Sequence, residues 1–148
     1  MKKVTLVSII LLFVGTGVMA QQTNIVVAIA KKYTDCVSTD LGYAVYSGTS
    51  RTSELGKKAE SRVKMENPGY ERVESKDNID WGDYMGNYMV IISASTTDSD
   101  GCKRYTLGVG FGTGSDSALK NAKKDLSGRN WSWSESRHGY SVVQEKRF

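Results

Sequence analysis

The sequence contains few of the residues that mark several specialised protein classes. Its 148 residues include one proline, one histidine and two cysteines. One proline excludes a collagen-like chain, and a single histidine without a CxxC pair gives no support to a zinc site. Hydrophobic residues make up 39% of the chain and charged residues 24%, a balance typical of a globular protein rather than a low-complexity one.

The chain also lacks a strong excess of either charge. It has 20 Lys and Arg residues against 16 Asp and Glu residues, a formal net charge of +4. Lys2 and Lys3 belong to an expected leader, so removal of that leader halves the excess. Nucleic-acid-binding domains carry much larger basic excesses, and we therefore expect no nucleic-acid partner.

Long apolar runs are confined to the start of the chain. Lys2 and Lys3 precede an almost wholly apolar segment, and small residues of the kind that signal peptidase accepts lie before Gln21. The run is shorter than the ~20 residues of a membrane-spanning helix. The pattern predicts a signal peptide at 1–20 and a secreted or periplasmic domain at 21–148, with no membrane anchor after cleavage.

The two cysteines predict a disulfide bond. An even number of cysteines favours a bridge in an oxidising compartment, and Cys36 and Cys102 allow only one connectivity. Each cysteine follows an expected strand in a different half of the chain. A bridge would therefore join the two halves.

Three short blocks of sequence recur in the same order, which predicts an internal duplication. The matching blocks are 24–29 with 87–92, 48–55 with 112–119, and 69–76 with 139–146. We expect a single domain made of two copies of one unit, 24–78 and 87–148, joined by a linker at 79–86. The second copy carries a short insertion after its helix.

Each copy has the pattern of a β-β-α-β unit. Apolar, β-branched runs predict the strands, and the apolar stripe of Leu55, Ala59 and Val63 predicts a helix. The expected strands are 24–33, 42–48, 70–76, 88–96, 105–112 and 140–147. We expect an α+β fold in which one sheet of about six strands carries both helices on one face, with the copies related by a pseudo-two-fold axis.

Glycines alternate along the expected strand 105–112. Gly108, Gly110 and Gly112 share one face, but the third glycine of a GxGxxG loop is missing and no lysine follows, so we expect no nucleotide cofactor. Such a bare stripe accepts a bulky ring or a second backbone. We expect the sheet face opposite the helices to be covered by the linker or by a second chain, which leaves a homodimer as one alternative.

Aromatic residues gather near the insertion and in the linker. Trp131 and Trp133 lie among Ser, Asn, Glu and Arg, surroundings that suit stacking on a sugar or anchoring a protein partner. The alternative is that these rings fold back into the core of a small domain. The candidate binding residues are Trp131, Trp133, Tyr140, Tyr70 and Trp81.

His138 defines the alternative, catalytic hypothesis. With Glu135 or Asp125 it could act as the acid/base pair of a small ribonuclease-like or glycan-cleaving hydrolase, with Arg137 as a further residue of the site. No GxSxG elbow is present, and a histidine before a glycine is typical of a turn. We therefore expect a secreted, non-catalytic binding or inhibitory module for an extracellular protein or carbohydrate, without metal or cofactor.

Overall fold

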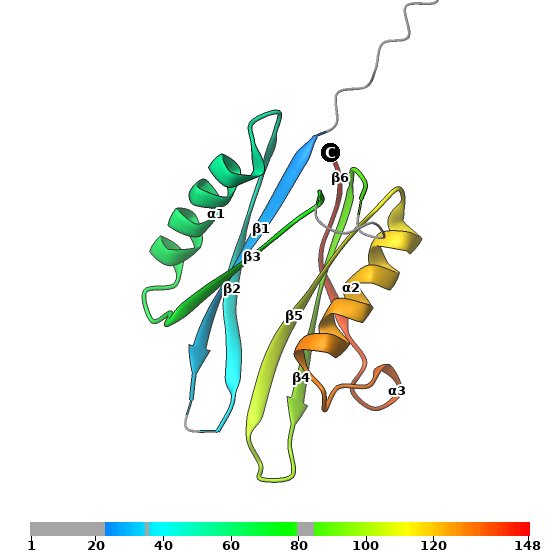
Figure 1. Ribbon diagram of the computed structural model, residues 1–148. Coiled ribbons are helices and arrows are strands. Elements are labelled where there is room, and N and C mark those ends of the chain that lie inside the picture. The colour runs from blue at the N-terminus through cyan, green and yellow to red at the C-terminus, as the bar shows by residue number, and fades with distance from the viewer. Residues whose placement is uncertain (1–22, 35, 80–84) are drawn as a thin grey trace, which may run out of the picture.

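The computed structural model describes residues 23–34, 36–79 and 85–148 (Figure 1). The expected signal peptide and Trp81 lie outside the described residues. The elements are β1 (Asn24–Tyr33), β2 (Ser38–Gly48), α1 (Thr52–Glu66), β3 (Arg72–Asp77), β4 (Tyr88–Thr97), β5 (Lys103–Gly112), α2 (Ser115–Arg129), α3 (Glu135–His138) and β6 (Ser141–Arg147). Both halves follow the order β-β-α-β, and the short α3 lies in the expected insertion.

The strands form two three-stranded antiparallel sheets, so the expectation of a single six-stranded sheet is wrong. In the first sheet β1 lies between β2 and β3, and in the second sheet β4 lies between β5 and β6. Each half places its first strand in the middle of its own sheet. The chain is therefore α+β, with one sheet contributed by each half.

The apolar character of the central strands explains this arrangement. β1 is buried from Ile25 to Ala30, and β4 is buried from Met89 to Ala94. Alternate side chains of a strand point to opposite faces, so each central strand needs an apolar partner on both sides. A single sheet with both helices on one face would leave the other face in water.

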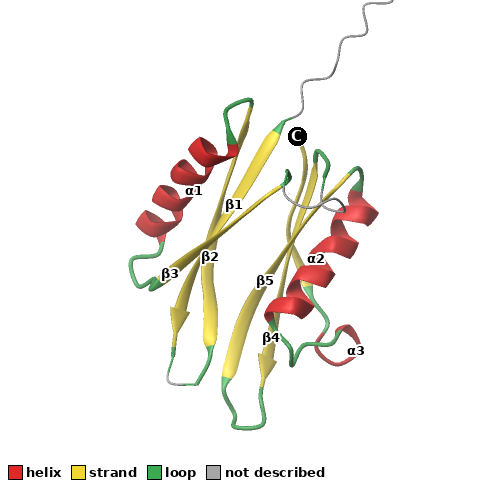
Figure 2. Cartoon of the chain, in the orientation of Figure 1, coloured by secondary structure: helices red, strands yellow, loops and turns green. Residues whose placement is uncertain are grey.

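The molecule meets this need with four layers, in the order α1, first sheet, second sheet, α2 (Figures 1 and 2). The helices lie on the outer faces, and the inner faces of the two sheets pack against each other. The cluster between the sheets contains Ile25, Val27, Ile29, Met89, Ile91, Leu107, Val109 and Phe111. The face that we expected the linker or a second chain to cover is thus covered by the other half.

Each helix packs on the outer face of its own sheet through small and branched side chains. α1 buries Leu55, Ala59 and Val63, as the helical spacing predicts. α2 buries Ala118, Ala122 and Leu126 against β4 and β5. Asn67, just after α1, donates its backbone N–H to the Val63 carbonyl, and Pro68 follows it.

The glycine stripe of β5 lies under α2 rather than on the face away from the helices. A Cβ atom at Gly110 would lie 2.0 Å from the Ala118 carbonyl oxygen and 2.2 Å from the Ala122 nitrogen. A Cβ atom at Gly108 would lie 2.4 Å from the Ala122 carbonyl oxygen. Of the two occupants that a bare stripe can accept, the structure has a second backbone, that of α2.

The Cys36–Cys102 disulfide is confirmed. The two Cα atoms lie 6.0 Å apart, and the bond joins the loop after β1 to the loop after β4. Both hairpins turn at the same end of the molecule, the lower end in Figure 1. The bridge therefore connects the two sheets at their hairpin ends. In the part of the chain that is described, no helix combines the length and the apolar character needed to cross a membrane.

A Gly110→Ala substitution tests the close contact between α2 and β5. We expect it to destabilise the fold by about 3 kcal/mol or more, because the new methyl group meets helix backbone that cannot move without separating the layers. Gly128→Ala is the control, since a Cβ there has no neighbour within 4 Å. This control should be neutral or stabilising by about 0.5–1 kcal/mol. Urea denaturation measures the unfolding free energy of both variants. Equal stability of the two variants would contradict the close contact between α2 and β5.

Replacing both Cys36 and Cys102 with Ser tests the bridge between the halves. The cysteines are 66 residues apart in sequence, and the chain-entropy model gives a loss of about 4 kcal/mol in unfolding free energy. Denaturation of the variant beside the oxidised parent measures this loss. Alkylation of unreduced, denatured parent followed by mass spectrometry should find no free thiol at either cysteine, and two modified cysteines would exclude the disulfide.

Candidate binding surface

The segment after α2 is fixed by a buried asparagine. Asn130 has no exposed surface, and its side-chain amide donates to the hydroxyls of Thr96 and Thr106, both at 3.1 Å. Its backbone N–H donates to Leu126, and its carbonyl accepts from the Trp133 N–H. A buried amide with these partners holds the turn that follows in one conformation.

The two tryptophans of this turn have opposite environments. Trp131 is 80% exposed. Trp133 packs against the cluster between α2 and the second sheet, and its indole Nε1 donates to the Gly139 carbonyl at 2.7 Å. Trp133 is therefore half-buried against the core, whereas Trp131 projects into solvent from a turn that is anchored on both sides.

The two candidate tyrosines have similar surroundings in the two halves. Tyr70 packs on the α1 cluster with the Lys64 ammonium 5.9 Å from its ring centre. Tyr140 packs on the α2 cluster with the Lys123 ammonium 4.6 Å from its ring centre. Their rings thus contribute to the cores, and among the candidates that the structure describes it is Trp131 that presents a mostly open ring.

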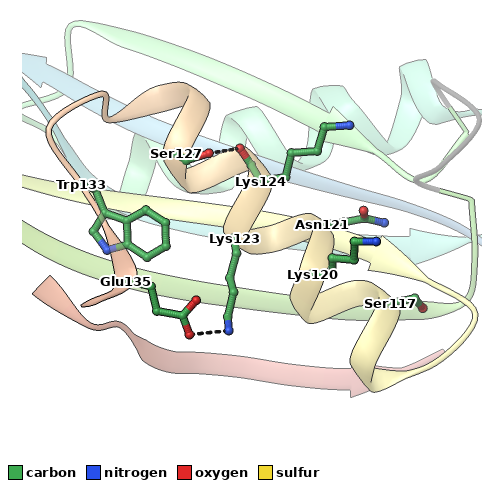
Figure 3. Close-up of a pocket in the computed structure, with 8 residues that line it drawn as sticks. All are labelled: Ser117, Lys120, Asn121, Lys123, Lys124, Ser127, Trp133 and Glu135. Carbon is green, nitrogen blue, oxygen red and sulfur yellow. Dashed lines mark hydrogen bonds and ion pairs between the residues drawn. The ribbon is translucent and has the colours of Figure 1, made fainter. Parts of the chain in front are cut away.

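An open groove runs along the outer side of α2 beside Trp133 (Figure 3). Its volume is about 700 Å³, and its lining residues are Ser117, Lys120, Asn121, Lys123, Lys124, Ser127, Trp133 and Glu135. We call it the α2 groove. Lys123 crosses from α2 to Glu135 at the start of α3, with 2.6 Å between ammonium nitrogen and carboxylate oxygen. This ion pair ties α3 to α2 and gives the groove one wall.

The alternative catalytic residues have other partners in the structure. His138 is exposed, and its Nδ1 accepts the Ser134 backbone N–H at 3.1 Å. Glu135 is bound to Lys123. Asp125 is buried on another side of α2, where it pairs with Lys76 and accepts the Val109 N–H. Each carboxylate is thus paired with a lysine.

A network of six charged side chains lies where β3 meets β5 and α2, and sequence reasoning missed most of it. Its members are Lys31, Asp40, Glu74, Lys76, Asp125 and Arg129. The carboxylates of Asp40 and Asp125 also accept the outward backbone N–H groups of Leu107 and Val109, at 2.7 and 2.9 Å. Arg129 donates to the Leu107 carbonyl. The network therefore supplies hydrogen-bond partners to the free edge of β5.

The surroundings of Asp40 and Glu74 shift the pKa values of these two carboxyl groups in opposite directions. Burial raises the pKa of Asp40, and the nearby Arg129 charge and Leu107 N–H only partly offset this effect. Burial alone would also raise the pKa of Glu74, but the Lys31 hydrogen bond together with the Lys31 and Arg129 charges lowers it below the usual 4.5. Lys31 lies 2.8 Å from the Glu74 carboxylate, and Arg129 lies 3.1 Å from it.

The described residues hold no group of three or more His, Cys, Asp or Glu side chains that could bind a metal ion. No family model, curated protein or solved structure matches this chain. The site must therefore be interpreted from its own geometry.

A Glu74→Gln substitution tests the electrostatic role of the network. Because the folded state lowers the pKa of Glu74, its carboxylate stabilises the fold above pH 4.5 and loses that effect as the pH falls through the lowered value. We expect the variant to be less stable than the parent by about 1 kcal/mol at pH 6, with a difference that shrinks towards pH 3.

Urea denaturation at several pH values measures this difference. Glu66→Gln is the matched control, because Glu66 forms an exposed ion pair with Arg62 on the surface of α1. The control should change the unfolding free energy by less than about 0.5 kcal/mol. A Glu74→Gln effect that is independent of pH would exclude the charge of Glu74 as its cause.

Proposed function

We propose that this protein is a secreted, non-catalytic binding module that holds an extracellular glycan on the surface formed by the 130–140 segment and α2. The observation that carries the proposal is the exposure of Trp131, 80% open to solvent on a turn fixed by Asn130 and Trp133. A rigid, exposed indole loses little conformational entropy when a ligand stacks on it.

The exposure of Trp131 is unfavourable in free energy and therefore needs an explanation. Its large apolar surface remains in water, although Trp133, two positions further along, packs its indole partly against the core. The hydrogen bonds of Asn130 hold the turn so that one ring points inward and the other outward. We infer that the outward ring is kept exposed for a ligand.

A glycan fits this surface better than a protein partner. Among the described residues, the other exposed large hydrophobic side chains come from several strands, one helix and the segment between β3 and β4: Tyr33, Leu41, Met65, Ile79, Met85, Tyr105, Val142 and Val143. A standard protein interface buries about 800 Å² on each partner around an apolar centre. A sugar ring needs only one aromatic face, with polar groups nearby for its hydroxyls.

Location and duplication complete the proposal. The disulfide is typical of an oxidising compartment, which supports secretion or a periplasmic location through the signal peptide expected at 1–20. The shared element order and strand order of the two halves support their origin as copies of one unit, related by an approximate two-fold axis. The Trp131 turn and α3 belong to the second half alone.

Trp131→Ala tests this function. Binding is measured by co-sedimentation with insoluble peptidoglycan and chitin, and by affinity electrophoresis in gels that contain dextran or polygalacturonate. We expect the parent to bind at least one of these glycans and the variant to bind it at least about tenfold more weakly. The unfolding free energy of the variant should be unchanged, because the ring is exposed.

His138→Ala is the control, and it should bind like the parent. Two results would contradict the proposal. One is a parent that binds none of the glycans. The other is hydrolysis of RNA or peptidoglycan by the parent that His138→Ala abolishes, which would favour the hydrolase.

A further inference from the structure

The turn that carries Trp131 lies against the outer face of the second sheet, just beyond the end of α2 (Figure 1). Asn130, on one side of Trp131 in the chain, donates to the hydroxyls of Thr96 and Thr106. Ser132, on the other side, donates its hydroxyl to that of Thr96 at 3.3 Å. Both chain neighbours of Trp131 are therefore bonded to the same threonine of β4, which places Trp131 at this part of the β4–β5 hairpin.

Arg104 of β5 lies on the same face of this hairpin. In the register of the two strands, Thr96 is directly opposite Arg104. Side chains that are directly opposite each other in an antiparallel pair have Cβ atoms about 4.5–5.5 Å apart. The Arg104 side chain therefore begins beside the threonine to which both neighbours of Trp131 are bonded. A ligand that stacks on Trp131 is within reach of its long side chain.

The positive charge of Arg104 is not neutralised by the protein. Arg104 is half-buried, and within the described part of the chain its guanidinium forms no ion pair and no hydrogen bond. The Asp98 carboxylate, in the adjacent hairpin turn, accepts the backbone N–H groups of Asp100 and Cys102 at 3.0 and 2.9 Å. A guanidinium presents its N–H donors in a planar fork, and these donors are available to a ligand.

The first half of the chain provides an internal comparison. Asn67 follows α1 as Asn130 follows α2, and each donates its backbone N–H to the carbonyl four residues earlier. After Asn67 the chain continues with Pro68 and Gly69, whereas after Asn130 it adds the Trp131 turn and α3. A β-β-α-β unit therefore folds without such a turn, and the fold alone does not account for it.

We propose that Trp131 and Arg104 form one sugar subsite, in which the indole stacks on the ring of a uronic acid and the guanidinium pairs with its carboxylate. This inference rests on the proposed glycan-binding function and adds the chemical class of the sugar. The carboxylate of a uronic acid projects from the edge of the ring, so the face remains open to the indole. A guanidinium matches a carboxylate with two parallel hydrogen bonds.

The test compares acidic polysaccharides with a neutral counterpart of the same sugar. Affinity electrophoresis and calorimetry measure binding of the parent to polygalacturonate, alginate and hyaluronan, and to methyl-esterified polygalacturonate and dextran. The methyl ester removes the charge and keeps the sugar ring. We expect the parent to bind at least one of the three acidic polymers more tightly than either neutral polymer, by about tenfold or more.

Arg104→Gln and Lys103→Gln form a matched pair of variants. Each removes one positive charge from β5, but adjacent side chains of a strand point to opposite faces, so Lys103 does not share the face of Trp131. Arg104→Gln should lose the preference for the acidic polymer, and Lys103→Gln should keep it. Urea denaturation of both variants should give the midpoint of the parent. The comparison with the methyl ester uses the parent alone and does not depend on the stability of a variant.

Several outcomes distinguish this inference from the proposed function. If a neutral glycan binds as tightly as the acidic polymers and Trp131→Ala abolishes binding of both, the glycan function stands and the inference about the sugar is wrong. An equal loss of binding in Arg104→Gln and Lys103→Gln would also overturn the inference, because it would indicate a general effect of charge. If no glycan binds at all, the proposed function itself fails.

Discussion

The free edge of β5 is the constraint on which the arrangement of the two halves depends. Its outward N–H groups at Leu107 and Val109 have no partner strand and donate instead to the carboxylates of Asp40 from β2 and Asp125 from α2. Arg129 binds the Leu107 carbonyl and joins Asp40 to Glu74 of β3. An unsatisfied backbone group in this position would be costly, and a bare edge would invite pairing with another chain. The same contacts fix the position of the first sheet relative to α2.

The glycine stripe, on the face of β5 that packs against α2, acts together with this constraint on the strand edge. Because Gly108 and Gly110 have no side chains, the backbone of α2 lies directly against β5. This closeness brings Asp125 and Arg129, on the flank of the helix, within reach of the edge of the strand. It also makes the outer surface of α2 a rigid base for the groove and for the Trp131 turn.

Local pattern in the sequence was sufficient for the elements and the disulfide, but not for the relation between the sheets. The apolar residues on both faces of β1 and β4 indicated that each sheet must pack against another layer on both sides. A strand's own pattern does not say which segment forms the second layer.

The match of Asn24 with Asn87 was also one residue out of register. In the structure Asn24 pairs with Gly48 and Tyr88 pairs with Gly112, so Tyr88 is the counterpart of Asn24. A shift of one residue exchanges the two faces of a strand.

The different environments of Trp131 and Trp133 could not be predicted from sequence, because they depend on buried contacts of Asn130 with β4 and β5. The charged network joins residues far apart in sequence, although the alternation of Arg72, Glu74 and Lys76 along β3 was a local sign that this strand faces polar groups.

The bridge between Cys36 and Cys102 has a consequence for the covalent connectivity of the chain. It closes a ring of polypeptide that contains β2, α1, β3 and β4. Cleavage of any one peptide bond inside this ring opens it but leaves all fragments joined through sulfur. A single cut within this ring would therefore not release the half that carries Trp131.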